Sequence, residues 1–147
     1  AGEAPFFGIG YQAFWVQGFA EAERLWDAFF IGTRSGFHFH NTFIAATVET
    51  GLIGCLLLSM VLLIALAGHL HRFLSTAHDL EALVLFTVAA LLAVRTFVEI
   101  DILNPYHVGS FLLYFAAGKL ADARGARRVQ AIRRVRLPLR GEGAARL

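Results

Sequence analysis

The chain has 147 residues with a formal net charge of +2, and 57% of them are hydrophobic while 16% are charged. This composition, with a mean hydropathy of +0.61, excludes an ordinary soluble domain. The single cysteine, Cys55, excludes an internal disulfide. Because the chain does not begin with Met, we expect it to be a piece of a longer, all-α integral membrane protein.

Residues 1–41 are mixed in composition, and none of their apolar runs is long enough to cross a bilayer. A charged, helix-compatible run follows an aromatic stretch, at residues 21–27. Trp15 and Trp26 suit a membrane–water interface, where amphipathic rings collect. We therefore predict an extracytoplasmic loop segment over residues 1–41.

Three apolar stretches follow, and we predict that each is a transmembrane helix. The first is the longest and reaches the roughly 20 residues that a helix needs to cross about 30 Å of hydrocarbon, whereas the third is short. The predicted helices are residues 42–68, 82–98 and 108–120, with a cytoplasmic connection at 69–81 and an outer loop at 99–107.

Small residues recur every fourth position along the first predicted span. This pattern allows another helix to approach closely, and at 100° per residue it places His40 on the same face. The small residues are Thr47, Gly51, Cys55 and Ser59.

The basic residues are concentrated at the C-terminal end, where nine of the 13 lie from Lys119 onward. Nucleic-acid binding is one explanation of such a tail. The preceding spans favour another, because cytoplasmic flanks of membrane helices are rich in Lys and Arg. We therefore predict a protein of the bacterial inner membrane, with a cytoplasmic tail over residues 121–147 and a periplasmic segment over residues 1–41. We predict no nucleic-acid partner.

The stretch His38-Phe39-His40-Asn41 stands at the outer start of the first span. An imidazole titrates near neutral pH, so His40 could act as a general base, although it could also be a histidine satisfied by backbone or water. Asn41 is a plausible N-cap for the helix that follows. A metal site would need His38 and His40 together, and no Cys or third His lies nearby in sequence, so we predict no metal.

Three further charged residues are candidates for a site on the outer side. Arg34 lies on a loop six residues before His40, and Arg95 lies near the end of the second span, where Glu99 is a possible partner. Glu49 lies nine residues after His40, and a carboxylate at membrane depth requires a partner or water. Solvated loop charges and a transporter pathway are the alternatives.

The spacing of His40-Asn41, nine residues, and Gly51-Leu52-Ile53-Gly54 resembles the signature of the O-antigen ligase and polysaccharide polymerase family. The stretches 7–15 and 37–44 are more specifically similar to its exopolysaccharide-polymerase branch. The resemblance covers roughly residues 5–120. It implies a polytopic inner-membrane glycosyltransferase, of which this chain would be a C-terminal piece.

The resemblance also implies a reaction, in which a glycan linked through pyrophosphate to undecaprenol is transferred to a hydroxyl of an acceptor glycan at the outer leaflet. His40 would be the base, an arginine would hold the pyrophosphate, and no metal or cofactor would be needed. Arg34 is the first choice and Arg95 the second, because guanidinium binds phosphate bidentately. The expected partners are the bilayer, the lipid-linked glycan and upstream helices, without which the piece would be inactive.

Two other classes stay open beside polymerisation. A ligase would use the same chemistry on a lipid or protein acceptor, and a transporter or structural fragment would give His40 no special role. The further substrate-binding candidates are His38, Asn41 and Glu49.

Overall fold

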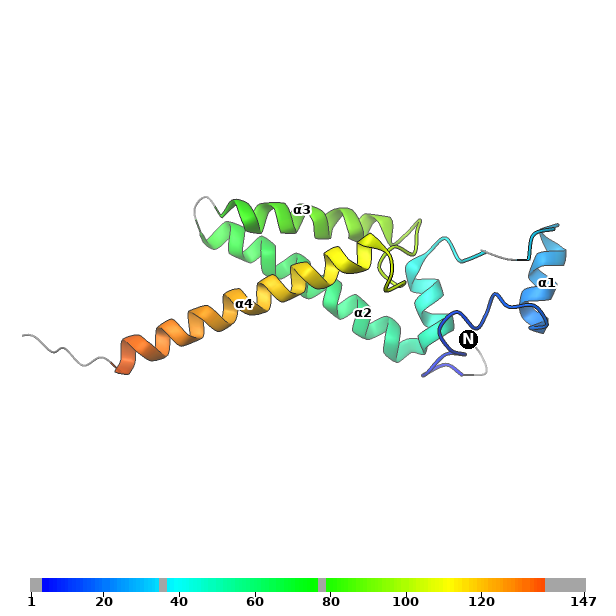
Figure 1. Ribbon diagram of the computed structural model, residues 1–147, viewed down its shortest axis with the longest axis horizontal. Coiled ribbons are helices and arrows are strands. Elements are labelled where there is room, and N and C mark those ends of the chain that lie inside the picture. Colours follow the sequence, from blue (N-terminus) through cyan, green and yellow to red (C-terminus); the bar gives the residue numbers. More distant parts are fainter. Residues whose placement is uncertain (1–3, 35–36, 77–78, 137–147) are drawn as a thin grey trace, which may run out of the picture.

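The computed structural model describes residues 4–34, 37–76 and 79–136. Within these ranges every regular element is an α-helix, which confirms the all-α class. The helices are α1 (Ala20–Ala28), α2 (Thr42–Ser75), α3 (Leu80–Arg95) and α4 (Val108–Arg136). Figure 1 shows α2, α3 and α4 packed together, with α1 beyond the N-terminal end of α2 and the last turns of α4 extending past its neighbours.

The helices begin close to the predicted positions but differ more at their ends. α2 continues to Ser75 instead of residue 68. α4 runs from the third predicted span, which ends at residue 120, into the basic tail and ends at Arg136. α3 begins at Leu80 and ends at Arg95, three residues before the predicted end. Charged residues end an apolar run, but Arg, Lys and Gln favour the helix as much as Leu does, so the helix need not stop there. The predicted tail from residue 137 lies outside the described residues.

In the described part of the chain, α2 is the helix whose length and composition allow it to cross a membrane. Only 22% of its most apolar window is buried, so most of that window faces outward, unlike a core helix of a soluble protein. α3 has 16 residues, about 24 Å at 1.5 Å per residue, which is less than the hydrocarbon thickness of about 30 Å. The three-span topology stays a prediction.

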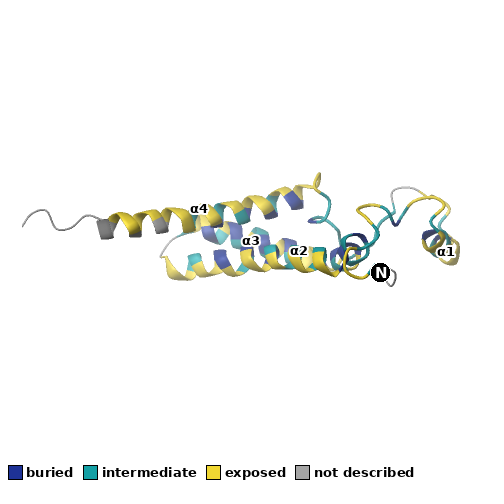
Figure 2. Cartoon of the chain, turned by 90° about the horizontal axis from the view of Figure 1, so that it is seen from below, coloured by how far each residue is buried: buried dark blue, intermediate teal, exposed yellow. Residues whose placement is uncertain are grey.

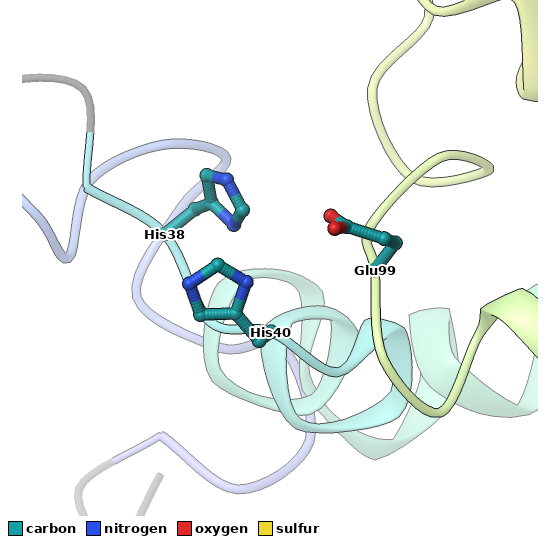
Figure 3. Close-up of side chains that lie close together, drawn as sticks. All are labelled: His38, His40 and Glu99. Carbon is teal, nitrogen blue, oxygen red and sulfur yellow. The ribbon is translucent and has the colours of Figure 1, made fainter.

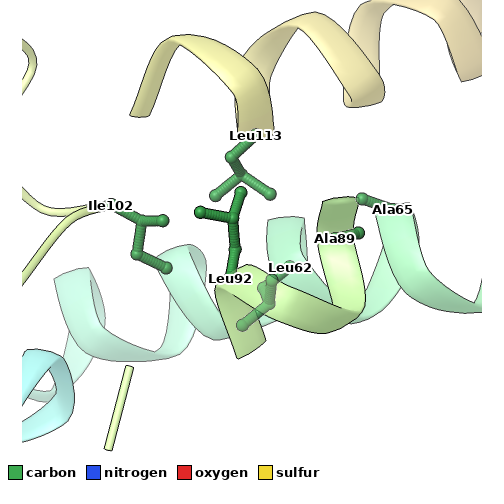
Figure 4. Packing of buried hydrophobic residues seen from close by; sticks show 6 residues of the cluster. All are labelled: Leu62, Ala65, Ala89, Leu92, Ile102 and Leu113. Carbon is green, nitrogen blue, oxygen red and sulfur yellow. The ribbon is translucent and has the colours of Figure 1, made fainter. Parts of the chain in front are cut away.

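The three long helices meet around one hydrophobic cluster, drawn in Figure 4, while their outer faces are exposed (Figure 2). Further along, a close approach joins α2 to α4: a Cβ at Gly68 would collide with the Leu120 side chain. The buried ring of His69 donates from Nε2 to the Ala116 carbonyl oxygen over 2.8 Å. The central cluster consists of Leu62, Ala65, Ala89, Leu92, Ile102 and Leu113.

The helix α2 is broken at Gly51, whose backbone has φ +71° and ψ −174°. Only glycine adopts this conformation readily, because a Cβ clashes there. The break frees backbone groups on both sides, and the N-terminal segment 5–10 pairs with them. Leu52 and Ile53 N–H donate to the carbonyl oxygens of Pro5 and Phe6, at 2.9 and 3.3 Å.

The same segment satisfies the carbonyl groups before the break. The backbone N–H groups of Ile9 and Gly10 donate to the carbonyl oxygens of Val48 and Glu49, and each hydrogen bond is 3.0 Å long. A Cβ at Gly8 would lie 2.5–2.6 Å from backbone atoms of residues 49 and 51, so glycine is needed for this approach as well. A second stretch of backbone thus satisfies the polar groups that the break in the helix leaves unpaired.

The prediction that His40 and the small residues share one helical face is wrong. α2 begins at Thr42, Asn41 is extended at φ −158°, and His40 therefore precedes the helix. The break at Gly51 also interrupts the rotation of 100° per residue on which the stripe depended.

Candidate functional site

The stretch before α2 is attached to the end of α3 by backbone and side-chain hydrogen bonds. Thr42 N–H donates to the Thr96 carbonyl oxygen over 2.8 Å, and the Thr42 hydroxyl donates to the Glu99 carbonyl oxygen over 2.5 Å. The side-chain amide of Asn41 donates to the Phe97 carbonyl oxygen over 3.3 Å. These bonds hold Asn41 and Thr42 against residues 96–99, which are distant in sequence.

Asn41 is the N-cap of α2, as predicted. Its Oδ1 accepts from Phe43 N–H at 3.0 Å and from Ile44 N–H at 3.1 Å. Two of the unpaired amides at the helix start are thereby satisfied. Both polar atoms of the Asn41 side chain already form hydrogen bonds with backbone groups. Its role as a substrate ligand stays a prediction.

His38, His40 and Glu99 converge, as Figure 3 shows. Each offers one ligand atom, and these atoms lie within 4.8 Å of one another. The two imidazole rings are 4.7 Å apart between centroids, and His38 Nδ1 lies 3.1 Å from the Phe39 carbonyl oxygen, a distance that suits donation from Nδ1–H. His40 is exposed and His38 is half-buried.

The carboxylate of Glu99 supplies a third donor that sequence spacing did not reveal. Our prediction of no metal considered only Cys and His residues nearby in sequence, and it did not consider a carboxylate from a distant segment; it stays a prediction. Zn²⁺ ligands at 2.0–2.1 Å in a tetrahedron stand about 3.4 Å apart, so a bound ion would have to draw the three residues closer together. The group could hold a divalent cation in that way, or serve as a base with a neighbouring carboxylate.

Arg34 lies in a different cluster. Its guanidinium is paired with Glu23 and, at 2.8 Å, with Asp27, both on α1. It also stands 5.8 Å from the centre of the Trp26 ring. Its predicted role as a pyrophosphate ligand stays a prediction, and a phosphate would have to displace these carboxylates.

Arg95 at the end of α3 forms an ion pair with Asp101. The alternative partner that we considered, Glu99, turns instead toward the histidines (Figure 3). Neither predicted arginine lines the cavity described next.

A cavity of about 350 Å³ lies between the N-terminal segment, the start of α2 and the α3–α4 connection. Glu49, His38 and His107 line it, whereas Asp101 is not among the lining residues. Sequence reasoning missed Gln12 and Asn104. The lining includes Tyr11, Gln12, Trp15, His38, Glu49 and Asn104.

Glu49 also influences its neighbour across this cavity. Burial raises the pKa of the Tyr11 hydroxyl, and the Glu49 charge raises it further. Tyr11 therefore stays protonated well above neutral pH and can donate a hydrogen bond.

A larger groove of about 690 Å³ lies between α2 and α4 at the opposite end of the bundle. Its walls are mainly apolar, with His71, Arg72 and Arg124 at one end. Such a lining suits acyl chains or another helix, which we predict as partners, and offers little for chemistry.

No family model matches the chain, and no solved structure matches it. The chain is similar to the exopolysaccharide production protein ExoQ of Rhizobium meliloti (strain 1021), with 68% identity over 124 residues, or 84% of this chain. The matched region is 28% of that relative, so the chain spans little more than a quarter of its length. At this identity the chain is a homologue of that part of an exopolysaccharide production protein, which agrees with the resemblance in its motifs.

Proposed function

We propose that this homologue of an exopolysaccharide production protein forms part of an inner-membrane polysaccharide polymerase. The polymerase would transfer an undecaprenyl-pyrophosphate-linked glycan to a hydroxyl of an acceptor glycan at the outer leaflet. The observation that supports this best is the convergence of exposed His40 with Glu99 beside a polar cavity at the start of a membrane-compatible helix.

In the proposed step, a ring nitrogen of His40 takes the proton of the acceptor hydroxyl. The freed electron pair of that oxygen forms a bond to the anomeric carbon of the donor glycan. The bond from that carbon to the pyrophosphate oxygen breaks, and undecaprenyl pyrophosphate leaves with the electron pair. The imidazolium that forms is stabilised by the nearby Glu99 carboxylate and then loses its proton to water.

The pyrophosphate requires cationic groups that the cavity itself does not offer. Arg34 and Arg95 are the candidates in this chain. Arg34 is paired with two carboxylates and Arg95 with one, and a pyrophosphate would have to replace them. We expect further arginines from upstream helices, packed against the exposed apolar face of α2. The predicted topology would place the donor in the outer leaflet beside His40.

The test is complementation with the full-length protein in a strain that lacks polymerisation. His40→Ala is expected to leave single repeat units at normal protein abundance, because loss of a general base typically slows a reaction by about 10²–10⁴-fold. His71→Ala is the matched control, since His71 is exposed near the other end of α2. Polymers of normal length in the His40→Ala strain would refute the assignment, and a transporter would predict that result.

A further inference from the structure

Two residues that line the cavity each carry a buried polar atom without a hydrogen-bond partner among the described residues. One is the carboxylate oxygen Oε2 of Glu49, a residue that is only 8% exposed. The other is Nε1 of Trp15. A buried polar group left unpaired costs about 1–3 kcal/mol, so native structures rarely keep one without a ligand or water to satisfy it.

Glu49 is held so that one carboxylate oxygen is used and the other is free. The backbone N–H of Gln12 donates to this carboxylate. Gln12 has φ +55°, in the left-handed region that residues with a Cβ seldom occupy. The adjacent break in α2 at Gly51 brings the segment containing Gln12 against Glu49. Strained backbone of this kind is concentrated at binding sites.

The chemistry of the lining points to a neutral ligand rich in hydroxyl groups. Three aromatic residues, Tyr11, Trp15 and Phe37, are among the lining residues, and aromatic side chains pack well against the C–H groups of a sugar ring. Glu49 offers an acceptor, the Trp15 N–H a donor and Asn104 both. No Lys or Arg is among the lining residues in the described chain, so the cavity does not suit a pyrophosphate.

The size and position of the cavity agree with this ligand. Its volume of about 350 Å³ is at the lower end of the range for small-molecule sites. His38 forms part of its wall and stands 4.7 Å, ring to ring, from His40. A sugar in the cavity would therefore hold a hydroxyl close to the proposed base.

We infer that this cavity binds one neutral pyranose unit of the acceptor glycan, with Glu49 accepting from a sugar hydroxyl and Trp15 Nε1 donating to a sugar oxygen. The assignment to the acceptor rests on the proposed function, whereas sugar binding itself does not. The donor glycan carries a pyrophosphate beside its reacting carbon, and its charge belongs near arginines, outside this cavity.

The experiment measures binding of oligosaccharide fragments of the host strain's own exopolysaccharide to the purified full-length protein by titration calorimetry. Glu49→Gln keeps the shape and an oxygen for the Gln12 N–H but loses the charge, and it should weaken binding about ten- to hundredfold. Trp15→Phe should also weaken binding. Trp26→Phe is its matched control, because Trp26 Nε1 is equally unpartnered and buried but lies outside the cavity.

The outcomes separate this inference from the proposed reaction. His40→Ala should bind the fragments normally and yet fail to polymerise. If His40→Ala polymerises normally while Glu49→Gln still binds weakly, the proposed chemistry fails and the sugar site stands. If Glu49→Gln and Trp15→Phe bind as the wild type does, or the wild type binds no fragment, only water serves the two buried atoms and the inference is overturned. If Glu49→Gln does not accumulate, Trp15→Phe decides.

Discussion

A methyl group at Gly51 should open the junction between the N-terminal segment and α2. The Gly51 backbone, at φ +71° and ψ −174°, lies in a region that is almost restricted to glycine. The new Cβ would also collide with the Phe6 carbonyl group. The substitution Gly51→Ala therefore forces the backbone at 51, or the segment at 5–7, to move.

The magnitude follows from two contributions. Strain in this backbone region costs about 1–3 kcal/mol. Displacing the N-terminal segment breaks the hydrogen bonds from Leu52 and Ile53 N–H, each contributing about 0.5–1.5 kcal/mol. We expect the free energy of opening the junction to fall by about 2–6 kcal/mol.

The assay is hydrogen exchange of the full-length protein in detergent, followed on peptides covering residues 4–10 and 45–53. A loss of 2 kcal/mol corresponds to about thirtyfold faster exchange of the amides at the junction. Amides in the core of the bundle, around Leu62 and Ala89, should be affected much less, because they pack away from the break.

Two other glycines separate the causes. Gly18 has φ +86° with open space around it, so Gly18→Ala tests strain without collision. Gly118 lies within α4 with nothing near its Cβ position, and Gly118→Ala should be neutral or stabilise the helix by up to about 1 kcal/mol. If Gly51→Ala exchanges no faster at the junction than Gly18→Ala does, our account of the break is refuted.

Three further predictions concern other contacts. His69→Leu removes the buried hydrogen bond to Ala116 and should lower the stability of the α2–α4 contact by about 1–3 kcal/mol. The measurement is the thermal midpoint of the full-length protein, which should fall. An unchanged midpoint would show that the bond contributes nothing. If Arg34 only anchors α1, then Arg34→Ala and Glu23→Gln should reduce polymer synthesis equally, while a much larger loss for Arg34→Ala would indicate a phosphate ligand. If His40 acts as a base, a chelator should leave polymerisation in membrane vesicles unchanged, and loss of activity that Zn²⁺ restores would instead make the cluster a metal centre.

Features that depend on neighbouring residues could be predicted from the sequence. The start of α2 at Thr42 and the cap by Asn41 follow from short-range hydrogen bonding between a side chain and the next amides. The start of α4 at Val108 and the apolar surface of α2 follow from composition alone. Helix ends were less predictable, because polar residues with good helix propensity continued α2 and α4 beyond their apolar parts.

The contacts between segments distant in sequence could be seen only in the folded chain. Nothing in the local pattern placed Glu99 beside His38 and His40, or the segment 5–12 against Gly51 and Glu49. Apolar periodicity reports which residues avoid water, not which segments meet. The break at Gly51 exists because another stretch of backbone satisfies the freed amides and carbonyls. The cavity beside it therefore arises from packing between distant segments, which apolar periodicity does not record.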